Sequence, residues 1–472
     1  MNLIYNVKDK PGFGQTLVFA FQQLLAIMAA TIAVPAIVGN GMTASAALVG
    51  AGIGTFVYQL FTKFRSPVFL GSSFAFLSSM FAAFAGAASM TLGYLGLIIG
   101  ACFAGLVYVV IALVVKAVGV RWIGKLMPAV VIGPTVAIIG LSLAGNAVGD
   151  MMKGDVTTMI EETAVPVASP FIALVCALVT LFVVILCSTY GGRKIRLIPF
   201  IIGILAGYVV ALVFTLIGNA NDIDALKIID FTPFKNLVAD GVKLSTFISL
   251  PDLTVIKAWN GWSELTPAYI GTIAVAYVPV AFVVFAEHIA DHKNLSSIIG
   301  KDLLEDPGLA NTLLGDGVGS FVGAIFGGCP NTTYGESIGC VAITGNASVI
   351  SITCAAALAV IVAFISPFVA FLDSIPACVM GGVCMTLYGF IAVSGLKMLQ
   401  PVDLNENRNL FVASVILIAG VGGLALNFAL KGGQTITVTE VACALILGII
   451  TNLMLSGKKE RPGEEEPQQL IK

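Results

Sequence analysis

Two acids and the chain's only two histidines lie within the apolar stretch VVFAEHIADH, residues 283–292. Glu287 and Asp291 are four residues apart, so a helix would place both carboxyl groups on one face. His288 and His292 have the same spacing, about 100° further round the helix. If this segment crosses a bilayer, an acid at that depth costs roughly 2.5–3.5 kcal/mol, which makes a functional role the default interpretation. The chemistry that we expect is proton binding and acceptance of hydrogen bonds from a substrate.

Two other interpretations of this stretch are open. The helix could end at Phe285, with EHIADHKN as its solvated cytoplasmic end, because Lys293 follows closely. The H-x-x-x-H spacing beside two carboxylates could also bind zinc, which would make the chain a membrane metalloenzyme. No further histidine and no C-x-x-C pair offers additional ligands, so we expect no metal and no cofactor.

A second acid, Glu336, lies in a segment whose helical pattern is interrupted. It lies in GGCPNTTYGESIG, residues 327–339, where Pro330 precedes a short helical stretch. A similar interruption is SPVFLGSSFAF, residues 66–76, with a proline and a glycine ahead of two serines. Proline disfavours helix just before itself, and Ser, Asn and Thr are good N-caps, so each pattern predicts extended chain followed by a half-helix. Such half-helices begin with unpaired N–H groups that carry partial positive charge.

The elements that must position these groups are membrane helices. The 472 residues are 58% hydrophobic and only 11% charged, whereas soluble proteins carry roughly 25% charged residues. The mean hydropathy is +1.00. A net charge of -2 gives no electrostatic footprint for nucleic acid, so that partner is not expected. The nine cysteines lie in or beside apolar stretches, and we interpret them as small core residues.

Fourteen apolar runs of about 20 residues are long enough to cross a hydrocarbon core of roughly 30 Å. The even count places both termini on one side. Most of the 24 lysines and arginines fall on that side, which the positive-inside rule identifies as cytoplasmic. The charged tail, residues 457–472, is predicted to be disordered and cytoplasmic. The predicted segments are 14–38, 43–62, 67–87, 91–117, 126–148, 167–189, 197–218, 267–298, 308–327, 329–345, 348–372, 376–396, 409–428 and 435–456.

The longest break, residues 219–266, separates seven segments from seven. An odd number per half would give two related halves opposite orientations, which is the inverted-repeat plan of many secondary transporters. The interrupted segment is the third in each half, as that plan requires. The predicted fold class is therefore an all-α polytopic membrane protein.

If Glu287 and Glu336 share one cavity with the half-helix amides, that cavity offers two carboxylate acceptors and a few backbone donors. Such a pattern suits a small, neutral, planar ligand with N–H groups beside C=O groups, such as a nucleobase. It suits an inorganic anion poorly.

Several blocks of the sequence resemble the nucleobase/ascorbate transporter family, and in particular its uracil permeases. The most specific block is NTTYGE, within PNTTYGESIGCVAITG, residues 330–345. The blocks GSSFAF, AEHIADH, KDLLEDPGLANTLLGDG and IPACVMGGVCMTLYG are also similar and occur in the same order. The likeness covers about residues 12–455.

The resemblance implies a single transporter unit, residues 1–472, whose fourteen segments form two inverted seven-segment repeats. Short strands would precede the half-helices of segments 3 and 10. A core domain would consist of segments 1–4 and 8–11, about residues 14–117 and 267–372. A gate domain would consist of segments 5–7 and 12–14, about residues 126–218 and 376–456. The resemblance further implies that the protein is not an enzyme. It also implies that the protein forms a homodimer in a bacterial inner membrane.

The resemblance also implies proton-coupled uptake of uracil and a set of substrate-contacting residues. Glu287 and Glu336 would accept the N–H groups of uracil. Backbone N–H groups at Phe74 and Gly335 would donate to its carbonyl groups. The rest of the implied substrate-binding set is Tyr334, Ala30 and, on the gate side, Tyr388.

One position departs from the family pattern. Asp291 stands where a uracil permease has a histidine, and His292 follows one place later. Neighbouring carboxylates repel one another, so the proton carrier could be Glu287, Asp291 or the pair acting together, with His292 as a further candidate. The base could also be xanthine or another oxopurine, because the sequence does not reveal the size of the pocket.

Overall fold

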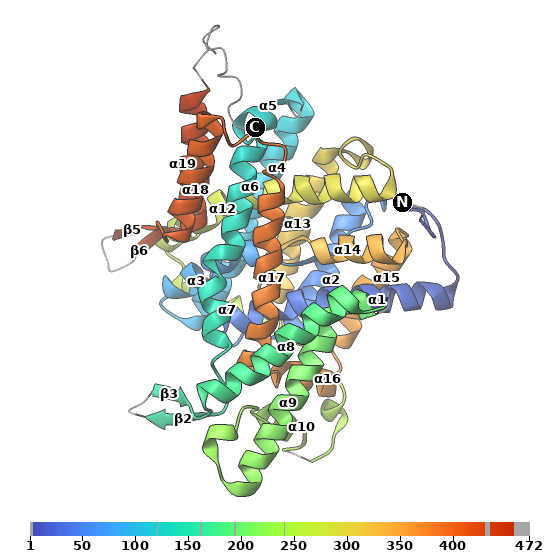
Figure 1. The fold of residues 1–472 in the computed structure, drawn as a ribbon, viewed down its shortest axis with the longest axis vertical. Coiled ribbons are helices and arrows are strands. Elements are labelled where there is room, and N and C mark those ends of the chain that lie inside the picture. Colours follow the sequence, from blue (N-terminus) through green and yellow to red (C-terminus); the bar gives the residue numbers. More distant parts are fainter. Residues whose placement is uncertain are drawn as a thin grey trace, which may run out of the picture.

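The computed structural model describes residues 3–119, 121–160, 163–192, 195–239, 241–429 and 435–456, and is mostly helical (Figure 1). The predicted tail, 457–472, lies outside the described residues. Within the described part, nine helices are long and apolar enough to cross a membrane. They are α1 (Phe13–Val38), α2 (Ala44–Phe61), α4 (Met90–Val118), α6 with α7 (Ala129–Asp150), α8 (Pro170–Tyr190), α9 (Pro199–Asn221), α12 (Pro267–Ile299), Leu304–Gly327 with α13 (Leu309–Gly327), and α17 (Ala377–Lys397).

Several other apolar helices are shorter. The predicted run 348–372 is two helices, because Pro367 starts a new helix after a bend. The predicted loop 219–266 contains two short α-helices and three 3₁₀ helices, η3 (Asp224–Leu226), η4 (Leu244–Thr246) and η5 (Trp259–Glu264). The shorter elements are η1 (Phe74–Phe76) with α3 (Leu77–Ala85), α5 (Arg121–Leu126), α10 (Thr232–Val238), α11 (Thr254–Ala258), α14 (Gly335–Thr344), α15 (Val349–Val362), α16 (Ser366–Asp373), α18 (Asn407–Val421) and α19 (Glu440–Leu455).

A short strand precedes each of the two half-helices, as predicted. β1 (Leu70–Ser72) leads to η1 and α3, and β4 (Asn331–Thr333) leads to α14. The two strands pair antiparallel, with Leu70 opposite Thr333 and Ser72 opposite Asn331, although some 260 residues separate them. The pair therefore joins the two interrupted segments directly.

Two further strand pairs were not predicted. β2 (Thr157–Ile160) pairs with β3 (Thr163–Pro166), and β5 (Leu426–Ala429) pairs with β6 (Thr435–Val438). Their β-branched residues favour extended chain, but the sequence pattern had assigned residues 426–428 and 435–438 to membrane segments.

Helix α12 contains the whole EHIADH stretch. Its start is defined by Thr266, whose side chain accepts a hydrogen bond from the Tyr269 N–H, with Pro267 as the first helical residue. The helix ends at Gly300, which adopts a left-handed conformation. The interpretation in which the helix ends at Phe285 is therefore wrong, since fourteen more helical residues follow.

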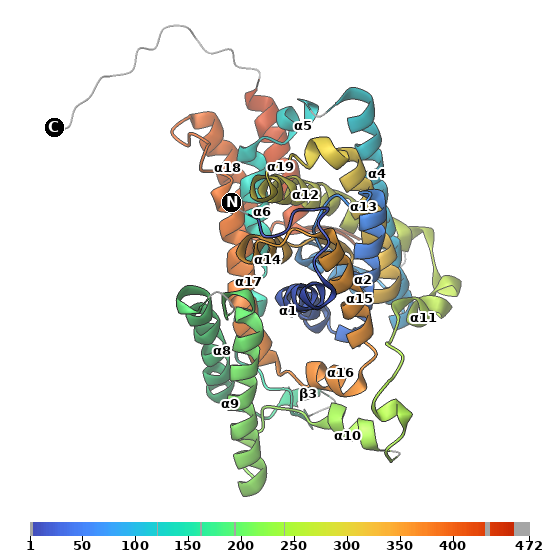
Figure 2. The same ribbon diagram turned by 90° about the vertical axis from the view of Figure 1, so that its right-hand side faces the viewer.

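The helices pack in two groups on either side of α1. In one group α13 packs against α2 and α4, and α12 packs against α4. In the other, α17 packs against α6 and α8, with α9 beside α8 and α18 beside α6. Figure 2 shows α1 nearly end-on, with α8, α9 and α17 on one side and α2, α4 and α13 on the other. Any cavity next to α1 can thus be lined from both groups.

Candidate functional site

A cavity of about 620 Å³ lies between the two groups of helices. One wall carries the acids of α12 and the beginnings of the half-helices. The opposite wall is mainly apolar and comes from α6 and α17. Its lining includes Ala26, Phe74, Glu287, Asp291, Thr333, Tyr334, Gly335 and Glu336 on the first wall and Val136, Ile139, Leu387, Phe390 and Ile391 on the second.

Most of the predicted site residues lie in this cavity. Glu287 and Glu336, which are 49 positions apart in the sequence, line it together, and so do Phe74, Gly335 and Tyr334. Phe74 begins η1 and Gly335 begins α14, so both residues stand at the amino ends of half-helices, where N–H groups lack partners within the helix. The arrangement combines carboxylate acceptors with backbone donors, as predicted.

Three predicted residues lie behind the lining rather than in it. Ala30 is buried in α1, one turn beyond the lining residue Ala26. Tyr388 is buried, and its ring meets the ring of Phe74 edge-on at 5.6 Å between centroids. His292 is turned away from the cavity. The sequence could not determine which way each helix face points.

The half-helices are held by side chains from several elements. Tyr334 donates from its hydroxyl to Ser72 O at 2.8 Å and from its backbone to Phe69 O at 3.1 Å. A Cβ on Gly71 would lie 2.3 Å from the Tyr334 ring, so the ring packs directly on the backbone of β1. The Phe69 N–H donates to Ser337 Oγ at 3.0 Å. These bonds fix the two half-helices relative to each other.

Both histidines belong to a buried hydrogen-bond network behind the cavity. His288 Nδ1 lies 2.6 Å from Asp316 Oδ2, and its Nε2 lies 3.0 Å from Thr312 Oγ1. His292 Nε2 lies 2.7 Å from the Tyr58 hydroxyl. The two imidazole rings stack at 4.0 Å. In the described part of the chain, no group of three His, Cys, Asp or Glu side chains has a metal-binding arrangement.

The sequence analysis missed Asp316 and Arg196. Asp316 is a fully buried acid in the middle of the apolar helix α13, which was a usable signal. Arg196, in η2 (Ile195–Leu197), lines the cavity from the connection between α8 and α9 and donates to Thr189 O at 2.7 Å. Nothing in its local sequence distinguishes it from other basic residues in short loops.

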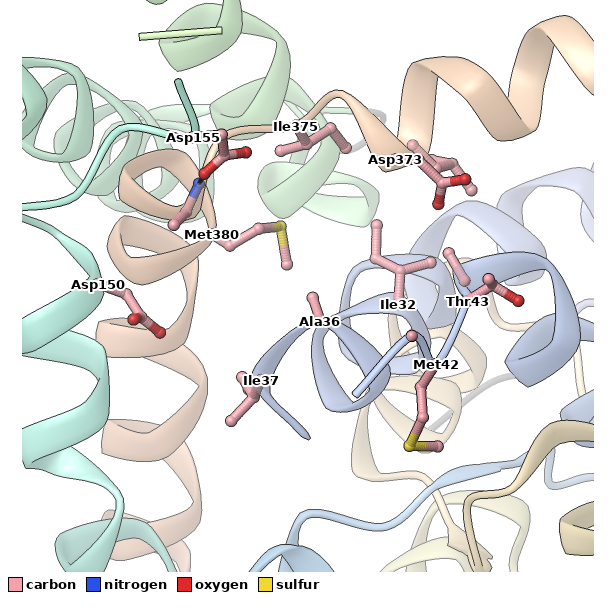
Figure 3. Close-up of a pocket in the computed structure, with 14 residues that line it drawn as sticks. Ile32, Ala36, Ile37, Met42, Thr43, Asp150, Asp155, Asp373, Ile375 and Met380 are labelled. Atoms are coloured by element: carbon pink, nitrogen blue, oxygen red, sulfur yellow. Dashed lines mark hydrogen bonds between the residues drawn. The ribbon is translucent and has the colours of Figure 1, made fainter. Parts of the chain in front are cut away.

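A second cavity, of about 390 Å³, is lined by three aspartates: Asp150, Asp155 and Asp373. Figure 3 shows Asp150 and Asp155 on the side of α7 and α17, and Asp373 on the far side toward Thr43. Helix α1 contributes Ala26 to the larger cavity but Ile32 and Ala36 to this one, so the two cavities lie at different levels along α1.

The acid Asp155 connects this smaller cavity to the start of α17. Its Oδ1 accepts a hydrogen bond of 3.0 Å from the Ala377 N–H, the first residue of the helix. Burial raises the pKa of Asp155 from 3.8 to about 6, against the lowering effect of the Ala377 N–H and with further upward contributions from Asp230 and Asp150. The charged carboxylate is thus unfavourable in the folded protein.

Asp155→Asn is expected to stabilise the folded protein in a pH-dependent way. The folded state binds the Asp155 proton more tightly than the unfolded chain does. The contribution of Asp155 to the free energy of unfolding of the wild type therefore falls as pH rises from 3.8 to about 6. Asparagine keeps an acceptor for Ala377 without the charge. We expect a gain of about 1 kcal/mol above pH 6, after allowing for solvent screening, and little gain near pH 4. Thermal unfolding in detergent across this range measures it.

The control for this measurement is Asp403→Asn, at an exposed position. An Asp155→Asn gain that is the same at pH 4 and pH 7 would contradict the assignment, because a change in packing alone does not titrate.

A family model described as the Permease family matches residues 14–428. The chain is 38% identical to a uracil permease of Bacillus caldolyticus over 461 residues, covering 97% of this chain and 96% of that protein. It is 38% identical to a uracil permease of Bacillus subtilis, covering 98% of each chain. It is 33% identical to the uracil permease of Escherichia coli K12, covering 95% of this chain and 94% of that one.

Two solved structures are similar in fold. The transmembrane domain of the cyanobacterial bicarbonate transporter BicA aligns with a TM-score of 0.61 at 15% identity, covering 95% of this chain and all of that one. Murine Slc26a9, an anion transporter in the inward-facing state, aligns with a TM-score of 0.60 at 12% identity, covering 95% of this chain and 69% of that one. At these identities the likeness concerns the fold alone.

Proposed function

The chain belongs to the Permease family, so it is a membrane transport protein rather than an enzyme, and we propose that it carries uracil into the cell together with a proton. The observation that supports this substrate most directly is the shared cavity. Glu287 and Glu336 line it beside the amino ends of two half-helices. Relatives that are 33–38% identical over nearly the whole chain are uracil permeases.

Uracil is complementary to this set of groups. The molecule has two N–H groups and two C=O groups around one planar ring. Carboxylates accept from N–H groups, and backbone amides at Phe74 and Gly335 donate to C=O groups. The apolar wall from α6 and α17 would cover the ring face, since Leu387, Phe390 and Ile391 lie there.

We propose an alternating-access mechanism with the core and gate domains that the family resemblance implies. The core would comprise residues 14–117 and 267–372, and the gate residues 126–218 and 376–456. The two packing groups around α1 support this division. On this proposal the shorter apolar helices complete fourteen segments in two inverted repeats, with both termini in the cytoplasm, and two copies form a dimer in a bacterial inner membrane.

The proton would be carried by Glu287, Asp291 or both, with His292 behind them. Glu287 and Asp291 line the same cavity and lie one turn apart on α12. A bare carboxylate is costly to move through a barrier in the membrane, so a proton that neutralises it would let the loaded site change sides.

Uptake of labelled uracil into proteoliposomes tests the function. We expect uptake to rise several-fold when the outside is made acidic and to disappear when a protonophore collapses the gradient. Liposomes without protein are the control. Unlabelled uracil should compete, and xanthine and hypoxanthine should compete weakly. Uptake that ignores the gradient would disprove proton coupling, and stronger competition by xanthine would assign an oxopurine as substrate instead.

A further inference from the structure

Thr333 joins an acid of the cavity to one of the two short strands. The Thr333 hydroxyl donates to Asp291 Oδ2 at 2.7 Å. The side chain of Thr333 is only 1% exposed, and both residues line the 620 Å³ cavity. Thr333 ends β4 and stands two residues before Gly335, the first residue of α14. The bond therefore runs from the acid of α12 to the chain that presents the Gly335 amide and the Glu336 carboxyl group.

A displacement of Thr333 would also reach the other half-helix. Thr333 is the register partner of Leu70 in β1, and the Ser73 N–H donates to Pro330 O at 2.9 Å. Phe74, which follows Ser73, begins η1. Through this strand pair, the position of β4 determines where both half-helix amino ends lie.

The strength of the bond between Thr333 and Asp291 depends on charge. A hydroxyl bonds more strongly to a carboxylate than to a neutral carboxyl group. Asp291 lies among charged or titratable groups on several of the elements packed around it. They are Glu287 and His288 on α12, Glu336 on α14, Asp316 on α13, Arg196 in η2, Tyr58 on α2 and Tyr108 on α4.

We propose that Thr333 is a positioning residue that makes uracil affinity depend on the charge of Asp291. With Asp291 charged, the hydroxyl holds β4 against α12. Protonation weakens this bond and frees the amide ends of η1 and α14 to close on the carbonyl groups of the ligand. This inference rests on the proposed function, because it concerns how the proposed uracil site is coupled to the proton.

Binding titrations of uracil to the full chain in detergent, at pH 5.5 and pH 8, test the proposal. The wild type is expected to bind about tenfold more tightly at pH 5.5, in the usual range of coupling between two ligands. Thr333→Val keeps the shape of the side chain but lacks the hydroxyl. The uracil affinity of this variant should differ by threefold or less between pH 5.5 and pH 8. Thr333→Ser keeps the hydroxyl and should retain the pH dependence of the wild type.

The matched control is Thr135→Val in α6. Thr135 is also buried, but its hydroxyl donates to Val131 O within its own helix. This variant should keep the tenfold pH dependence. Asp291→Asn provides the same test from the other side if Thr333→Val is not recovered in folded form, and it should be as insensitive to pH as Thr333→Val.

The outcomes separate this inference from the function on which it rests. A wild type that does not bind uracil at either pH would overturn the proposed function and this inference with it. A wild type that binds with pH dependence, beside a Thr333→Val or Asp291→Asn variant with the same pH dependence, would overturn only the role of Thr333. Loss of pH dependence in Thr333→Ser would also overturn it, since the hydroxyl is then not the cause.

Discussion

Glu287→Gln is expected to weaken uracil binding about 100-fold and to abolish measurable uptake. The carboxylate is the acceptor proposed for a uracil N–H group, and a hydrogen bond to a charged group contributes about 1.5–3 kcal/mol. Glutamine can turn N–H groups toward the ligand and removes the negative charge, so the loss should lie at the upper end of this range. Isothermal titration of the purified protein with uracil measures the affinity.

The matched control is Glu305→Gln, which makes the same chemical change at an exposed position beyond the end of α12. Both variants should elute as the wild type does, which excludes misfolding. Glu336→Gln should also lose binding, because it lines the same cavity. A Glu287→Gln variant that binds uracil within threefold of the wild type would remove Glu287 from the site.

Gly50→Ala is expected to prevent recovery of folded protein. A Cβ on Gly50 would lie 2.4 Å from Gly323 O and 2.9 Å from the Cα of Gly327, so α2 and α13 touch backbone to backbone there. No flexible side chain can move aside to make room. Forcing the two helices apart should cost about 3 kcal/mol or more, since overpacking alone costs about 1–3 kcal/mol.

The same crossing supports the site, because the Asn331 side chain of β4 donates to Gly50 O at 3.0 Å. The yield of monodisperse protein and its thermal unfolding temperature measure the effect. Gly271→Ala is the control, because no atom of another element lies within 4 Å of the added methyl group and alanine favours a helix over glycine. If Gly50→Ala is as stable as Gly271→Ala, the close crossing of α2 and α13 is incorrect.

Some of the site could be predicted because its signals are local. Pro330 predicts extended chain followed by a half-helix, and β4 and α14 confirm that order. The predicted capping is not observed, because the N-cap of α14 is Tyr334, whose side chain makes no capping hydrogen bond. An acid deep in an apolar run is expensive unless it has a role, which pointed to Glu287. The same reasoning applied to Asp316 would have found the acid of the buried network, but the sequence analysis did not consider it.

Other features could not be predicted because they depend on how each helix is rotated. Asp291 and His292 are adjacent in the sequence, yet Asp291 lines the cavity and bonds to Thr333, whereas His292 bonds to Tyr58 behind it. Successive residues of a helix point about 100° apart, so a small rotation exchanges their surroundings. Packing contacts of α12, such as the ring of Tyr277 against Gly100 of α4, set that rotation.

The sequence by itself determined that the chain is a membrane protein with two interrupted segments and acids near them, because the length of an apolar run, a proline and a carboxyl group act within one segment. Only the tertiary structure decided which acids share a cavity, that β1 pairs with β4, and that Thr333 bonds to Asp291. These contacts join residues that are tens to hundreds of positions apart, and close helix packing, rather than local preference, brings them together.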